Sequence, residues 1–439
     1  MYPIRLIAMG FALIILIGSF LLMLPLASKS GFSIGFTNAL FTSASATCVT
    51  GLVVVDTFQQ WSLFGQIVIL CLIQIGGLGF ITFGTYMLVL FRQKIGLRGR
   101  EYVKESLNIL QLSGVVKLVI HIINWTFVVE IIGAALLSIR FIPQLGLFKG
   151  IYFSIFHSVS AFCNAGFDLM GIHSAFSSFC TYSNDWLVNF VLSSLIIIGG
   201  IGFVVIDDIV KYKFHFKRYV LHTKLVLTTT FILIILGTIV YFLLEKDKLF
   251  SDMPLSEKWL SSYFSSVTTR TAGFNTSDTS ALSSPSKLFT MILMFIGGSP
   301  ASCAGGIKTT TIAIIFITLY SHLKNADEVN VFGRSLYESA IHKAAVVVTI
   351  NLLLSILGVM LIMIFQNFSL EDTLFEVFSA IETVGMSTGI TGDLSVPSKI
   401  VLVFLMYSGR LGSLTFAFIF ARSSLKPPIR QPKEKLIIG

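Results

Sequence analysis

The chain has 439 residues, of which 54% are hydrophobic and only 12% are charged, and its formal net charge is +9 at pH 7. This composition excludes an ordinary soluble globular protein and requires several membrane spans, with lipid as the surrounding partner. The basic residues lie in loops between apolar runs, where cytoplasmic loops of membrane proteins carry them, so the net charge does not predict nucleic-acid binding.

Apolar runs long enough to cross a bilayer occur about eight times, and the sequence therefore predicts an all-α polytopic membrane protein with eight transmembrane helices. The first run follows Arg5 and is long enough to be a retained helix rather than a signal peptide. In chain order the runs cover roughly 5–27, 63–92, 116–139, 185–210, 224–244, 287–320, 344–366 and 398–421.

A shorter amphipathic stretch lies between the two runs of each pair and ends in a polar loop with a glycine. These stretches, at 34–46, 151–162, 259–269 and 372–381, are too short to cross the membrane and are predicted to be pore helices. Aligned on the loop glycines, each unit has an aromatic residue ten positions upstream, namely Phe41, Phe156, Tyr263 and Phe375.

The four glycine loops predict a cation filter. Non-helical backbone is tolerated at membrane depth only where it is buried in protein or lines a wet cavity, and glycine allows carbonyl oxygens to turn inward. The C-terminal end of each pore helix would also favour a cation. The predicted filter residues are Val49, Thr50, Gly51, Asn164, Ala165, Gly166, Thr271, Ala272, Gly273, Thr383, Val384 and Gly385.

A second glycine repeat follows each filter loop, at 76–77, 199–200 and 297–298, with a degenerate fourth copy at Gly409-Arg410. The two repeats together predict four tandem units of helix, pore helix, loop and helix, in a pseudo-fourfold arrangement around one pore. We expect the units at 1–92, 93–212, 213–323 and 324–421, followed by a cytoplasmic tail at 422–439.

The third copy continues into ten small or helix-breaking residues, 297–306, inside an apolar run. This segment predicts an intramembrane gating loop below the filter, whereas a packed kink is the structural alternative. Two nearby cations would hold the loop through its carbonyls or set an electrostatic barrier. The predicted gating residues are Gly297, Gly298, Ser299, Pro300, Gly305, Gly306, Lys308 and Arg410.

Two charged residues lie three positions before their filter glycines, Arg270 and Glu382. Because an unpaired charge at that depth is costly, we expect an ion pair between them, with exposure to extracellular water as the alternative. His157 lies in the second pore helix and is expected to be a hydrogen-bonded structural residue. The five cysteines lack metal-ligand spacing.

The segments VTGL, NAGF, RTAGFNT and TVGMSTG, with GGSPASCAGGIKT downstream, resemble the Trk/Ktr/HKT superfamily of potassium transporters. The chain is most similar to the membrane subunit of Ktr systems, over essentially its full length. The resemblance implies four channel-like units in one chain, with filter glycines at the four positions above. A serine at the first of these accompanies sodium selectivity in the plant branch, so Gly51 implies potassium.

The resemblance further implies a homodimer in the bacterial cytoplasmic membrane, regulated by a cytoplasmic ring of RCK-type subunits, similar to KtrA or KtrC, that bind ATP or ADP. The basic loops predict that both termini are cytoplasmic. No nucleotide-binding motif occurs in the chain itself, so we expect no cofactor there.

Two other classes of protein compete with a channel-like uptake protein. An intramembrane enzyme would need a paired catalytic site, and the adjacent Asp207 and Asp208 point to different helix faces. A secondary cation transporter would show two related halves rather than four units. A sodium co-ion, and hence sodium/potassium symport, stays open at this point.

Overall fold

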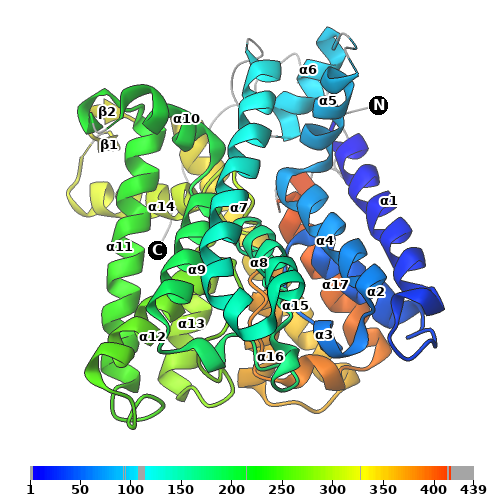
Figure 1. Cartoon of the computed structure of the whole chain (residues 1–439). Coiled ribbons are helices and arrows are strands. Elements are labelled where there is room, and N and C mark those ends of the chain that lie inside the picture. Colours follow the sequence, from blue (N-terminus) through cyan, green and yellow to red (C-terminus); the bar gives the residue numbers. More distant parts are fainter. Residues whose placement is uncertain are drawn as a thin grey trace.

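The computed structural model describes residues 3–91, 93, 95–106, 114–213, 215–326, 328–412 and 415–416. Helices standing side by side form most of it (Figure 1). Among the described residues, β structure is limited to an antiparallel hairpin of β1 (Asn330–Val331) and β2 (Arg334–Ser335), in which Asn330 pairs with Ser335, and one isolated bridge. The expectation of an all-α protein holds apart from these short pairings. The predicted tail at 422–439 lies outside the described residues.

The same order of elements, a long helix, a short helix, a loop and a further helix, occurs four times. The first half of the chain contains α1 (Pro3–Met23), η1 (Pro25–Ala27), α2 (Phe36–Cys48), α3 (Thr57–Gln60), α4 (Leu63–Leu78), α5 (Phe80–Leu90), α6 (Leu97–Ser106), α7 (Val115–Leu145), α8 (Leu147–Phe162), η2 (Met170–Ile172), η3 (Cys180–Tyr182), α9 (Trp186–Gly200), α10 (Phe203–Tyr212) and η4 (Phe216–Arg218). The second half contains α11 (Leu221–Glu245), α12 (Leu255–Thr268), α13 (Ser284–Phe295), α14 (Thr309–Leu323), the hairpin, α15 (Glu338–Phe365), α16 (Leu370–Ile381), η5 (Ile390–Asp393) and α17 (Val396–Leu411).

Three of the apolar runs are broken, and two of these were expected to be continuous helices. Helices α4 and α5 meet at 95°, and α9 and α10 meet at 99°. Gly79 and Gly202 lie at these bends with φ of +80° and +96°, a backbone conformation that favours glycine. The third run is divided into α13 and α14 by residues 296–308. Within the described residues, four helices are long and apolar enough to span a membrane, or six if each bent pair is one span.

The four short helices α2, α8, α12 and α16 occupy the interior of the bundle. The long helices α1, α7, α11 and α15 surround them. In the most apolar 18-residue stretch of each long helix, only 28–39% is buried. Their remaining apolar side chains face outward, as expected for helices surrounded by lipid.

Each short helix also packs on the last helix of the preceding unit. Helix α8 packs on α4, α12 on α9 and α16 on α13, while α2 near the start of the chain packs on α17 near its end. This cyclic pattern brings the four polar loops that follow the short helices to the centre of the bundle.

Candidate functional site

The backbone takes the same unusual course in all four glycine loops. The residue two positions before each glycine has a positive φ, and so does the glycine itself, whereas the residue between them does not. Such alternation can direct successive carbonyl oxygens to one side. The values are +58°, +57°, +68° and +53° at Val49, Asn164, Thr271 and Thr383, and +95°, +69°, +77° and +92° at Gly51, Gly166, Gly273 and Gly385.

The four glycines form a closed ring. A Cβ atom added to Gly51 would lie 2.6 Å from the carbonyl oxygen of Ala165 in the next loop and 3.0 Å from the Cα of Gly166. The same relation recurs between Gly166 and Ala272, between Gly273 and Val384, and between Gly385 and Thr50. Each glycine therefore faces the carbonyl of the next loop in chain order, and the fourth loop meets the first.

A hydroxyl near the end of each pore helix holds its loop in place. In the first and fourth loops, the glycine N–H donates to a serine hydroxyl, Ser45 at 3.1 Å and Ser379 at 3.0 Å. In the second and third loops, the hydroxyls of Ser160 and Thr268 donate, both at 2.7 Å, to the carbonyl of the residue after the glycine. Sequence reasoning missed this set of four hydroxyls.

An aromatic residue precedes each of these hydroxyls by four positions, and this spacing could have revealed them. In three units this aromatic residue is the expected one, Phe41, Phe156 or Phe375. In the third unit it is Phe264, which is fully buried, instead of the expected Tyr263. The third loop is one residue shorter between hydroxyl and glycine, so alignment on the glycine shifted the helix by one position.

The predicted gating segment lies against the glycine loops. A Cβ atom on Gly297 would lie 3.3 Å from the side chain of Thr271, and one on Gly305 would collide with the side chain of Thr383. Thr271 and Thr383 are the left-handed residues of the third and fourth loops. The segment 297–306 is therefore in contact with the ring on the side of these residues.

Backbone hydrogen bonds tie this segment to the glycine repeats of other units. The N–H groups of Ser299 and Cys303 donate to the carbonyls of Gly200 and Gly199 at 2.9 and 3.1 Å. The N–H of Gly306 donates to the carbonyl of Gly409 at 3.3 Å. These acceptors are at or near helix ends, where carbonyl oxygens lack partners within the helix. On the same segment, the carbonyl of Pro300 faces Gly202, and a Cβ atom there would lie 2.5 Å from the oxygen.

The two predicted cations contact the segment through carbonyls. The Lys308 ammonium donates to the carbonyls of Ala304 and Gly305 at 2.7 and 3.0 Å. The Arg410 guanidinium donates to the carbonyl of Cys303 in the segment and, at 2.9 Å, to that of Gly77 in the first unit. Of the two roles considered, holding the segment through its carbonyls is the one that these contacts match.

The prediction of an ion pair between Arg270 and Glu382, both within the described residues, is wrong. The Arg270 guanidinium donates to the Thr230 hydroxyl on α11 at 3.3 Å. A Glu382 carboxyl oxygen accepts from the N–H of Ile307 at 2.6 Å. Both side chains are buried, which also excludes exposure to extracellular water. Glu382 thus binds the residue that follows segment 297–306.

The other singled-out side chains have structural partners. His157 is buried, and its ring nitrogens contact the carbonyl of Phe153 at 2.7 Å and the N–H of Leu169 at 3.0 Å. Asp207 lies 3.7 Å from His121, and Asp208 accepts from the N–H of Val220 at 3.0 Å. The two aspartates therefore diverge, as expected.

Comparison with known proteins places this arrangement in a family. A family model described as cation transport protein, TrkH, matches residues 6–426. The chain is 40% identical to the potassium/sodium uptake protein NtpJ of Enterococcus hirae and 41% identical to the Ktr system potassium uptake protein B of Bacillus subtilis. In both cases 100% of this chain and 97% of the relative are covered.

The fold matches a solved structure as well. The crystal structure of the potassium transporter TrkH from Vibrio parahaemolyticus superposes with a TM-score of 0.72 at 19% identity, covering 94% of this chain and 85% of that one. The chain therefore belongs to the TrkH family of cation transport proteins, which are multi-pass membrane transporters and not enzymes.

Proposed function

We propose that this chain is a potassium-uptake protein that conducts the dehydrated ion through the ring of four glycine loops. The closed ring, in which each glycine faces the carbonyl of the next loop, carries the proposal. Rings of backbone carbonyls can replace the hydration shell of K⁺. The names of the relatives, which describe potassium uptake, support the same ion.

The proposal includes a gate formed by residues 297–306. This segment contacts the ring, and glycine repeats of three units hold it directly or through Arg410. Conduction would require these hydrogen bonds to be exchanged, so the segment would have a closed and a displaced arrangement. The four-unit division of the chain and its eight transmembrane segments belong to this proposal.

Regulation would come from a separate subunit. Three relatives are named as components of a Ktr system, and this chain has no nucleotide-binding motif of its own. We therefore assign ATP or ADP binding to a cytoplasmic RCK-type ring of the KtrA or KtrC kind, with this chain as a homodimer in the bacterial cytoplasmic membrane.

Uptake of tracer K⁺ and Na⁺ into cells that lack other potassium transporters tests the function. Expression should restore K⁺ accumulation, and excess unlabelled K⁺ should suppress tracer entry more strongly than excess Na⁺ does. Equal suppression by the two ions would contradict a potassium filter.

The name of the Enterococcus relative favours a second candidate, coupled potassium and sodium transport. Membrane vesicles distinguish the two candidates. A conductive pathway should pass K⁺ in sodium-free buffer and equilibrate at the potassium diffusion potential, whereas obligatory symport would move little K⁺ until Na⁺ is added.

A labelling experiment tests the orientation. Ser280, between α12 and α13, and Ser335, in the hairpin, are both exposed. Because the hairpin and the basic loops lie at the same end of the bundle (Figure 1), Ser280→Cys should react with an impermeant maleimide in intact cells and Ser335→Cys only after lysis. The unsubstituted chain controls for the native cysteines, and reversed labelling would contradict cytoplasmic termini.

A further inference from the structure

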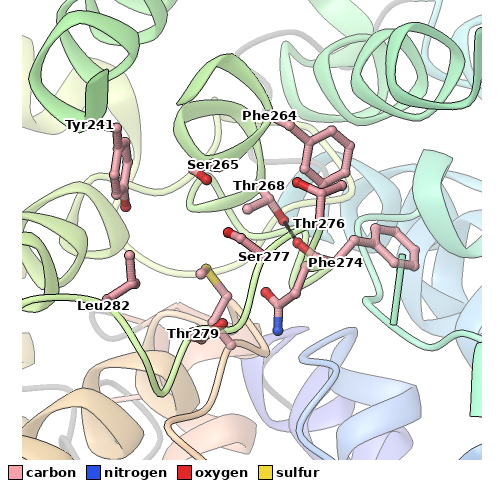
Figure 2. A pocket seen from close by; sticks show the side chains of 11 residues that line it. Tyr241, Phe264, Ser265, Thr268, Phe274, Thr276, Ser277, Thr279 and Leu282 are labelled. Atoms are coloured by element: carbon pink, nitrogen blue, oxygen red, sulfur yellow. Dashed lines mark hydrogen bonds between the residues drawn. The ribbon is translucent and has the colours of Figure 1, made fainter. Parts of the chain in front are cut away.

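A small polar pocket lies next to the ring, between the third and fourth units (Figure 2). The last turns of α12 and Tyr241 of α11 form one side, and the residues that follow Gly273 form another. Met386, directly after the fourth filter glycine, completes the wall. The pocket has room for about one water-sized sphere.

Three residues that line this pocket have a side-chain oxygen with no hydrogen-bond partner among the described residues. These atoms are the hydroxyl oxygens of Thr276 and Thr279 and the side-chain oxygen of Asn275. The two threonines are only 3% and 4% exposed. Buried polar atoms are nearly always paired, so three unpaired side-chain oxygens on residues that line one pocket indicate a ligand.

The charges around the pocket favour a cation. No lysine, arginine or histidine lines it, and the C-terminal end of α12 supplies a negative dipole end. One turn beyond Tyr241, the buried Glu245 carboxyl accepts hydrogen bonds from Ser283 and from the Leu249 N–H, with no cationic partner in the described chain.

The nearest buried cation in the sequence points elsewhere. Arg270 donates to Thr230, which is 11 residues before Tyr241 on the same helix and therefore about 16 Å away along its axis. The guanidinium thus does not fill the pocket or neutralise it.

We propose that this pocket binds one dehydrated alkali cation, Na⁺ or K⁺, through the side-chain oxygens of Thr276, Thr279 and Asn275. Neutral oxygens suit a monovalent ion, whereas divalent cations are usually held by several carboxylates. The site is separate from the conduction ring, and an ion there would hold together the loop after Gly273, next to Met386 of the fourth loop.

Thermal unfolding of the purified full chain tests the site without any measurement of flux. The melting temperature is measured in increasing NaCl and, separately, KCl, with N-methylglucamine chloride keeping ionic strength constant. A ligand that binds only the folded state raises the melting temperature with its concentration. Thr276→Val and Thr279→Val remove one hydroxyl each while keeping the side-chain shape.

We expect each single variant to need about fivefold more of the bound cation for half of the stabilisation, and the double variant to lose this component in one salt or both. The salt affected identifies the ion. Thr238→Val is the matched control, because that hydroxyl bonds only to the carbonyl of Ile234 in its own helix. If the double variant lowers the melting temperature equally in all three salts, the hydroxyls hold water or nothing, and the proposal is overturned.

Discussion

Gly51 shows at the scale of one residue why the ring requires glycine. It has a φ of +95°, and a Cβ atom there would lie 2.6 Å from the carbonyl oxygen of Ala165. A side chain would therefore strain the loop and displace a carbonyl of the ring. We expect Gly51→Ser to reduce the preference for K⁺ over Na⁺ by about tenfold or more, measured as competition in tracer uptake.

Gly84 provides the control for this substitution, because it is in α5 and a Cβ atom there meets nothing within 4 Å. Gly84→Ser should retain the selectivity of the unsubstituted protein at a similar amount in the membrane. Unchanged selectivity in Gly51→Ser would remove Gly51 from the filter.

The serine hydroxyls beneath the glycines give a second prediction at this scale. Ser379→Ala leaves the Gly385 N–H without its 3.0 Å acceptor, and the loss of one such hydrogen bond costs about 1 kcal/mol. We expect selectivity between K⁺ and Rb⁺ or Na⁺ to fall by roughly fivefold, because the ring is less firmly held.

The matched control is Ser43→Ala, since the Ser43 hydroxyl bonds to the carbonyl of Ile15 on α1 and not to a filter loop. Equal behaviour of the two alanine variants would show that the hydroxyl of Ser379 serves packing alone.

The residue scale also shows what the sequence can predict. The loop glycines were identifiable because unusual backbone needs a specific residue type at a fixed spacing. The Arg270–Glu382 pair failed because equal positions in two loops do not fix where long side chains point. Arg270 turns to α11 and Glu382 to the N–H of Ile307, and no local pattern encodes either partner.

Among the elements, the segment 297–306 has a geometry that makes deletion feasible. A Cβ atom on Gly297 would lie 3.0 Å from the carbonyl oxygen of Gly305, and one on Gly298 would collide with Ala304. The two ends of the segment are thus adjacent, and removal of residues 299–304 should leave α13 and α14 in place. We expect K⁺ influx without the regulatory subunit to rise several-fold, measured in vesicles, with selectivity retained.

Arg410→Ala should shift influx in the same direction, because it removes the guanidinium that joins Cys303 to the first unit. Arg140→Ala is a suitable control, since Arg140 forms a partly exposed ion pair with Asp185 at 2.9 Å.

If the deletion protein reaches the membrane and its influx stays unchanged or falls, the segment is a packing kink.

The hydrophobic pattern of the sequence could not predict the bends in the helices. The runs 63–92 and 185–210 are apolar on both sides of the break, and length alone predicts one span for each. The glycine repeats did mark the places, because Gly79 and Gly202 have the positive φ that turns the chain. The bend between α9 and α10 is also held by hydrogen bonds to segment 297–306, which connect parts of the chain about a hundred residues apart.

For the molecule as a whole, a measurement of ATP binding tests whether nucleotide regulation belongs to a separate subunit. The purified chain should show no saturable ATP binding at micromolar concentrations, because it has no phosphate-binding loop. Addition of a KtrA-type ring should produce binding and change K⁺ influx. Saturable ATP binding by this chain alone would contradict a separate regulatory subunit.

The single segment at 297–306 also explains an advantage of joining four units in one polypeptide. A homotetramer repeats every insertion four times around its axis, and four such segments would compete for the same space next to the ring. When the units share a chain, one can acquire such a segment while the others supply the groups that hold it, as Gly199 and Gly409 do here directly and Gly77 does through Arg410. Covalent linkage thus permits the gate proposed for this segment, which rotational symmetry would forbid.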